Sequence, residues 1–128
     1  MDINKIKSDL RMEQFYFSEC SITREPNVQN GSLSMDLTKE ISEQENGSYH
    51  IKLTLDVTKS GDDLHVRVVA NAIFSMDNDD VELVRSLMEV NTVAIMFPFI
   101  RSQVSLLTTQ PGMTPIIIPP INTAKFKS

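Results

Sequence analysis

The sequence predicts an α+β fold, in which a four-stranded antiparallel sheet, arranged as a meander, is followed by a long helix packed on one face. Strand-like stretches occupy the chain up to residue 76, and a stretch with helical periodicity comes after them. Tight-turn sequences separate most of the strand-like stretches, as expected of antiparallel neighbours. With 128 residues, the chain is expected to form one domain, 1–128, that buries a core without disulfides or metals.

The N-terminal part of the chain predicts a short helical turn and then a strand. The turn is expected over residues 2–9. Residues 12–23 are rich in aromatic and β-branched side chains, which favour strands. Phe15 and Phe17 fall on one face of this strand and Tyr16 on the other, so we expect the strand to be buried on both faces.

Three further strands are predicted after a loop over residues 26–32. Each has apolar side chains at alternate positions, which is typical of a half-buried strand: residues 33–41, 51–58 and 64–76. Asn46-Gly47, the strongest short hairpin signal, joins the first two of these strands. Residues 59–63 form the next turn.

A long helix is predicted over residues 91–108, with two apolar stripes on a 3.6-residue wheel. The first stripe contains Val93, Met96, Phe97, Ile100, Val104 and Leu107. The second lies nearly opposite and contains Ile95, Phe99 and Leu106. A polar flank between the stripes contains Arg101, Ser105 and Thr108. The second stripe indicates a helix between its own sheet and a partner subunit, and the alternative is a central helix buried inside one domain.

The sequences on either side of this helix predict where it begins and ends. Asp77-Asn78-Asp79-Asp80 supplies a cap for a short amphipathic segment, 81–88, and Pro98 should kink the helix or mark its start. Gln110-Pro111-Gly112 ends the helix. Residues 113–121, the Ile/Pro segment, place three consecutive Ile among three Pro, which excludes an ordinary central strand. This segment should cover a core or line an apolar groove.

Composition excludes several classes of protein. The net charge of −5 and the pI near 4.9 argue against nucleic acid as the main partner. Cys20 is the single cysteine, so no intramolecular disulfide is expected, and a reducing cytoplasm is the natural location. The N-terminus lacks the apolar run of a signal peptide, and no apolar run approaches the length of a membrane span.

Signs of catalysis are lacking in the sequence. His50 and His65 fall on different predicted strands without companion ligands, so we expect no metal site. Asp77-x-Asp79 begins like a calcium loop, but the later ligand positions do not fit. We therefore expect no enzyme and no cofactor. The two-striped helix, the first strand and the Ile/Pro segment carry more apolar surface than one small core needs, which indicates protein interaction.

Three motifs resemble the SecB protein-export chaperone family. They are Phe97-Pro98-Phe99-x-Arg101 in the helix, Gly112-Met113-x-Pro115 after it, and Pro119-Pro120-Ile121-Asn122. The resemblance extends from about Phe15 to Phe126. It implies a single SecB-like domain that assembles as a homodimer or as a homotetramer, a dimer of dimers. It also implies a holdase that binds unfolded polypeptides in apolar grooves without ATP, for protein export or for a dedicated client such as an antitoxin.

The resemblance also implies roles for particular residues. The polypeptide-binding groove would receive contributions from Met113, Ile116, Ile117 and Ile118. Packing and assembly would involve the helix signature and the first strand: Phe15, Phe17, Phe97, Phe99 and Arg101.

Two departures from the family pattern concern the C-terminal end. The Asn-Phe pair of the family is Asn122-Thr123 here, and most members continue into a second helix and a basic tail that contacts the translocase motor ATPase. Contact with that motor is therefore an open expectation. The alternative function is a SecB-fold interaction or assembly protein with one specific protein partner, of phage or mobile-element origin.

Overall fold

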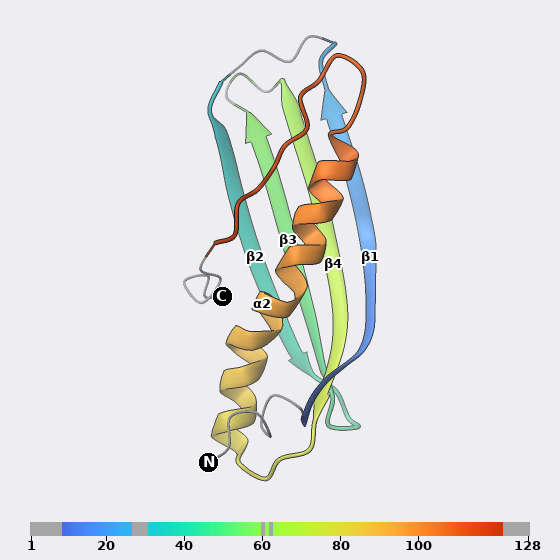
Figure 1. Cartoon of the computed structure of the whole chain (residues 1–128). Helices are drawn as coiled ribbons and strands as arrows, with labels where there is room; N and C mark the ends of the chain where they lie inside the picture. Colours follow the sequence, from blue (N-terminus) through green and yellow to red (C-terminus); the bar gives the residue numbers. More distant parts are fainter. Residues whose placement is uncertain (1–8, 27–30, 60, 62, 122–128) are drawn as a thin grey trace.

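The computed structural model describes residues 9–26, 31–59, 61 and 63–121. Most of the helical turn predicted over 2–9, and the middle of the first loop, lie outside these residues. The described chain forms four strands and one long helix, in the order β1 (Leu10–Arg24), β2 (Leu33–Glu43), β3 (Tyr49–Lys59), β4 (Leu64–Met76) and α2 (Val81–Leu107) (Figure 1). This confirms the predicted α+β class, with its four-stranded antiparallel sheet and the helix after it.

The order of the strands in the sheet differs from the predicted meander in one respect. β2, β3 and β4 are antiparallel neighbours in chain order, as predicted, but β1 pairs with β4 instead of β2, giving the order β1-β4-β3-β2. This is Greek-key connectivity. A β1–β2 hairpin would need a tight turn. The connection between Arg24 and Leu33 is longer than such a turn, so the two strands need not be neighbours.

The short segment and the long helix predicted separately are one continuous helix of 27 residues. It begins after Asp80, whose carboxylate accepts a hydrogen bond from the Leu83 backbone N–H at 3.1 Å. Pro98 lies inside the helix, so the prediction that it could mark the start is wrong. Ala94 and Pro98 both lie on the exposed side, where water can satisfy the carbonyl that a proline leaves without a partner.

The core lies between α2 and one face of the sheet, across which the helix runs diagonally (Figure 1). Strands β3 and β4 contribute fully buried side chains at alternate positions, including Ile51, Leu53, Leu55, Val66, Val68 and Phe74. The first predicted stripe of α2 packs against them, with Val93, Met96, Phe97, Ile100 and Val104 buried and Leu107 partly buried. The opposite face of the sheet carries polar groups such as Lys52, Asp56 and Arg67.

The second predicted stripe of α2 remains exposed. Ile95, Phe99 and Leu106 keep 39%, 48% and 68% of their surface accessible. The alternative of a helix buried on all sides within one domain is therefore wrong.

The predicted burial of β1 on both faces is also wrong for the single chain. Phe15 and Phe17 are partly buried against the core, whereas Tyr16, on the other face of the strand, is exposed.

α2 is also long and apolar enough, by length and composition alone, to cross a membrane. Its first stripe, however, forms part of the core beneath it. A single helix of this kind is weak evidence for a membrane span.

Candidate functional site

The Ile/Pro segment leaves the end of α2 and crosses the sheet toward β2 (Figure 1). The polar flank of α2 holds its backbone through three hydrogen bonds. The Ile116 N–H donates to Thr108 Oγ1 at 2.8 Å, and Ser105 Oγ donates to the Ile116 carbonyl at 2.9 Å. Arg101 Nη1 donates to the Ile118 carbonyl at 3.3 Å. Positions 101, 105 and 108 share one side of a helix, so this flank can replace the neighbouring strand that the segment lacks.

The predicted binding residues divide into buried and exposed side chains. Ile116 and Ile118 are buried in the core beneath the segment, whereas Ile117 is 81% exposed and Met113 is partly buried. The alternation results from the extended backbone, in which successive side chains point to opposite sides. Ile116 and Ile118 therefore anchor the segment, and Ile117 is the side chain that it presents to solvent.

An apolar groove of about 380 Å³ lies between the Ile/Pro segment and the start of β2. Seven uncharged residues line it: Leu33, Met35, Val57, Ile116, Ile117, Ile118 and Pro119. Leu33 and Met35 lie on the edge strand and are 47% and 40% exposed. Sequence reasoning did not assign these two to the site. Their alternation in a strand was the available signal, but it does not show that the strand is at an edge.

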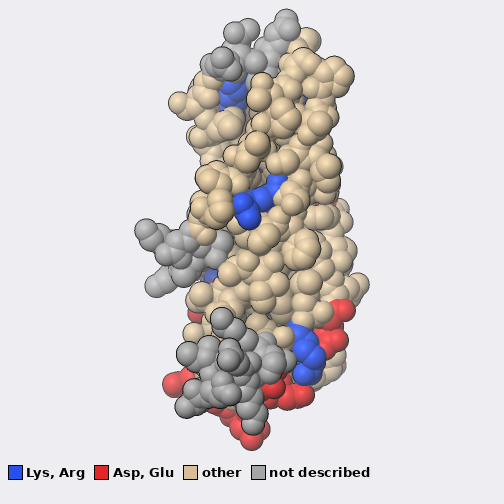
Figure 2. Space-filling view, in the orientation of Figure 1, with Lys and Arg blue, Asp and Glu red and all other residues tan. Residues whose placement is uncertain are grey.

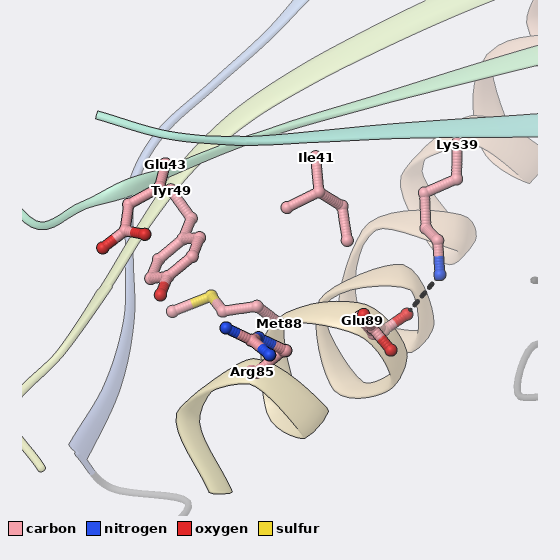
Figure 3. Close-up of a pocket in the computed structure, with 7 residues that line it drawn as sticks. All are labelled: Lys39, Ile41, Glu43, Tyr49, Arg85, Met88 and Glu89. Atoms are coloured by element: carbon pink, nitrogen blue, oxygen red, sulfur yellow. Dashed lines mark hydrogen bonds between the residues drawn. The ribbon is translucent and has the colours of Figure 1, made fainter. Parts of the chain in front are cut away.

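A second hollow, of about 340 Å³, lies at the other end of β2, between the ends of β2 and β3 and the first half of α2 (Figure 3). Figure 3 shows apolar side chains, Ile41 and Met88, beside charged ones of both signs. Lys39 Nζ donates to the Glu89 backbone carbonyl at 2.7 Å across it. Met35 and Ile41 both lie on the face of β2 that points toward α2, so the same strand borders both hollows.

The predicted assembly residues also separate. Phe97 is buried in the core, whereas Phe15, Phe17 and Phe99 form an aromatic cluster between β1 and α2. The Phe15 and Phe17 rings meet edge to face at 5.2 Å, and the Phe15 and Phe99 rings lie 5.0 Å apart. Such distances are typical of stabilising aromatic pairs. Arg101 takes a different role, since it binds the Ile/Pro segment.

Charge is unevenly distributed over the face that carries α2. Figure 2 shows that most of this face is free of charged residues and that acidic groups gather at its lower end. The upper and middle parts carry no visible acidic group and only isolated basic ones, so most of their surface is uncharged (Figure 2). Exposed apolar side chains of the chain include Phe99, Leu106 and Ile117.

Groups with possible chemistry lie apart from one another. His50 Nε2 lies 2.8 Å from Asn71 Oδ1, and His65 Nε2 lies 2.8 Å from Asp56 Oδ1. Partial burial raises the pKa of the Cys20 thiol above its ordinary value, which lowers its reactivity. Within the described ranges, no three His, Cys, Asp or Glu side chains gather in a way that could hold a metal ion.

Comparison with known sequences gives one family match over nearly the whole chain. The profile of the family described as "Preprotein translocase subunit SecB" matches residues 5–127. Protein-export protein SecB of Methylobacillus flagellatus is 30% identical over 118 residues, covering 89% of this chain and 72% of that protein. SecB of Neisseria meningitidis is 28% identical, covering 87% and 82%. An uncharacterized Methanocaldococcus jannaschii protein is 34% identical, but the match covers only 48% of this chain and 39% of that protein.

Comparison with solved structures supports the same fold. The SecB-like chaperone Rv1957 of Mycobacterium tuberculosis, solved with a ChAD peptide from the HigA1 antitoxin, aligns with a TM-score of 0.72. The alignment covers 91% of this chain and 90% of that one at 9% identity. A protein of unknown function from Streptococcus agalactiae aligns with a TM-score of 0.51 at 11% identity, covering 86% and 96%. At these identities the likeness concerns the fold.

Proposed function

The chain belongs to the SecB family, and from this premise we propose that it is an ATP-independent chaperone, a holdase for unfolded or non-native polypeptides. The observation that carries the proposal is the uncharged groove between the Ile/Pro segment and β2, bordered by exposed Leu33, Met35 and Ile117. An unfolded polypeptide exposes apolar side chains that such a groove can remove from water. Binding of this kind needs neither a reactive side chain nor a cofactor.

The anchoring of the Ile/Pro wall of the groove supports the proposal. Ile116 and Ile118 anchor one wall in the core, and backbone hydrogen bonds from α2 fix its direction. A preformed wall loses little conformational freedom when a client binds. Each fully buried Ile or Leu contributes about 1.5–3 kcal/mol, and the contacts along the groove must together exceed the roughly 4–15 kcal/mol that association costs in lost translational and rotational freedom.

We further propose that the chain works in the cytoplasm as a homodimer or homotetramer. The second stripe of α2, Ile95, Phe99 and Leu106, is too apolar and too exposed to suit a monomer. It adjoins the aromatic cluster of Phe15 and Phe17, so a second copy could cover both surfaces together.

The client would be a precursor for export or a dedicated protein such as an antitoxin. The mycobacterial structural relative was solved with an antitoxin peptide, which makes the second class a reasonable candidate here. Docking to the translocase motor ATPase remains a prediction from the family.

The test is dilution of a chemically unfolded, slowly folding protein into buffer without ATP, with and without this chain. Light scattering is recorded, and the oligomer mass of the chain is measured in parallel. We expect suppression of scattering that increases with the concentration of the chain. If the correctly assembled chain leaves scattering unchanged for several unrelated clients, the general holdase is refuted, and an adaptor for one specific partner takes its place.

A further inference from the structure

Arg24, at the end of β1, joins two segments that are far apart in sequence. Its guanidinium donates to five oxygens. Two belong to the residues that follow β1: Nε donates to the Glu25 carbonyl at 3.1 Å and Nη2 to the Pro26 carbonyl at 2.8 Å. Three belong to the turn after α2: Nη1 donates to Gln110 Oε1 at 3.4 Å and to the Pro111 carbonyl at 3.1 Å, and Nη2 donates to the Gly112 carbonyl at 3.4 Å. All three nitrogens are used. One set of acceptors belongs to the connection that leaves β1, and the other belongs to the turn after α2.

An arginine suits this position better than any other side chain. The planar guanidinium presents its donors in a fixed fork, whereas the ammonium of lysine is a compact point charge with three donors. Among the described residues, no carboxylate lies within ion-pair distance of Arg24, so its charge serves carbonyl and amide oxygens.

The charge also stabilises the end of α2. The last turn of α2 contains no basic residue, although cations are favourable at that negative end of the helix. Arg24, at the end of β1, supplies a positive charge near this end of the helix. Gln110 connects the two, because its side-chain amide accepts a hydrogen bond from Arg24 and donates one to the Leu107 carbonyl at 2.8 Å.

One of the two segments held by Arg24 continues to the apolar groove. The Ile/Pro segment, which forms one wall of the groove, starts directly after Gly112. Gly112 has φ of +74°, and a Cβ there would lie 3.7 Å from Arg24 Nη2. The positive φ, rather than this ordinary van der Waals distance, favours glycine at the turn. Arg24 itself does not line the groove.

We propose that Arg24 is a positioning residue for polypeptide binding. Its guanidinium holds the turn after α2, from which the Ile/Pro segment starts, against the end of β1, and so fixes the position of this wall of the groove. The inference rests on the proposed holdase function and adds a determinant outside the binding surface.

The experiment compares Arg24→Lys and Arg24→Gln with the parent chain and with Arg67→Lys. Arg67 is the matched control, because it pairs with Asp56 and Glu19 on the opposite face of the sheet. Three quantities are measured: the Kd for an unfolded polypeptide, the thermal midpoint of unfolding, and amide hydrogen exchange by residue. Lysine keeps the charge and loses the fork, so both Arg24 variants should weaken binding by about tenfold, the effect of losing charge-assisted hydrogen bonds.

Exchange separates positioning from general stability. The Ile116 amide, bonded to Thr108, should exchange faster in both Arg24 variants, while amides of β3 and β4 keep the parent rate. The control loses a fork of its own, so its thermal midpoint can fall, but its Kd and its Ile116 exchange should match those of the parent. Loss of binding with equal acceleration at all amides would overturn the inference in favour of a purely global role. Unchanged Kd and unchanged Ile116 exchange would overturn it as well.

Failure of the holdase proposal is distinguishable from failure of this one. If the parent chain binds no unfolded polypeptide, the proposed function fails, and with it the role of Arg24 in binding. If the parent binds and Arg24→Lys binds equally well, the holdase stands and the positioning role falls.

Discussion

Replacing Ile117 by Asp tests the groove at its most exposed side chain. Full burial of an Ile side chain contributes about 1.5–3 kcal/mol. Ile117 is 81% exposed in the free chain, so contact with a client can bury most of it and contribute about 1–2.5 kcal/mol. Because each 1.4 kcal/mol changes an equilibrium constant tenfold, Ile117→Asp should weaken client binding by roughly five- to sixtyfold. Exposed substitutions of this kind change the free energy of unfolding by less than about 0.5 kcal/mol.

Two further variants make this prediction specific. Val81→Asp replaces another exposed β-branched side chain, 67% accessible, at the start of α2, where a negative charge is tolerated. It should bind clients like the parent chain. Ile118→Ala removes a side chain that is 4% exposed, and should lower the free energy of unfolding by about 2–5 kcal/mol. Ile117→Asp should therefore lose binding and keep stability, whereas Ile118→Ala should lose stability first.

The assay is a titration of a fluorescent unfolded polypeptide, with calorimetric unfolding and oligomer mass measured on the same samples. Ile117→Asp that binds as tightly as the parent, at unchanged mass and stability, would refute the assignment of the groove. A loss of binding that Val81→Asp shares would point to a general effect of added negative charge.

Three other predictions concern assembly, the Ile/Pro segment and the cysteine. Phe99→Ser, which removes the ring that contacts Phe15, should lower the oligomer mass in light scattering after size exclusion and leave the sheet folded; an unchanged mass would exclude this stripe as the interface. Thr108→Val removes the acceptor for the Ile116 N–H and should lower the free energy of unfolding by about 1–3 kcal/mol in urea titrations, with no loss if the hydrogen bond is dispensable. Cys20 has a raised pKa and therefore less thiolate at neutral pH, so iodoacetamide should modify it more slowly than free cysteine; equal or faster modification would contradict the shift.

The elements of the fold were largely predictable because their signals are local. Asn46-Gly47 and the alternation of Ile51, Leu53 and Leu55 define a hairpin strand without reference to the rest of the chain. The stripes of α2 are likewise evident from periodicity alone. The pairing of β1 with β4 was not predictable in this way, because a strand pattern states which residues share a face and not which strand lies beside it.

The site was predictable in part for a similar reason. The composition of the Ile/Pro segment indicated that it covers a core or lines an apolar groove. In the structure it does both, because Ile116 and Ile118 are part of the core and the segment also lines the groove. Which Ile is exposed depends on the register of the extended backbone against α2, set by Ser105 and Thr108, and the sequence does not state that register. Leu33 and Met35 resemble ordinary core positions until the strand order places them at an edge.

The Greek-key connectivity has a consequence for how the chain folds. β2, β3 and β4 follow one another closely in sequence and can pair as soon as each is synthesised. The pairing of β1 with β4 instead joins residues far apart in sequence, from Leu10 with Met76 to Arg24 with Leu64. Closing so long a loop is entropically costly, so β1 is expected to dock late. During synthesis, Phe15 and Phe17 emerge before β4, so they are expected to lack their partner strand until β4 has left the ribosome. A protein proposed to bind the apolar segments of other chains is therefore expected to expose apolar side chains of its own β1 during synthesis.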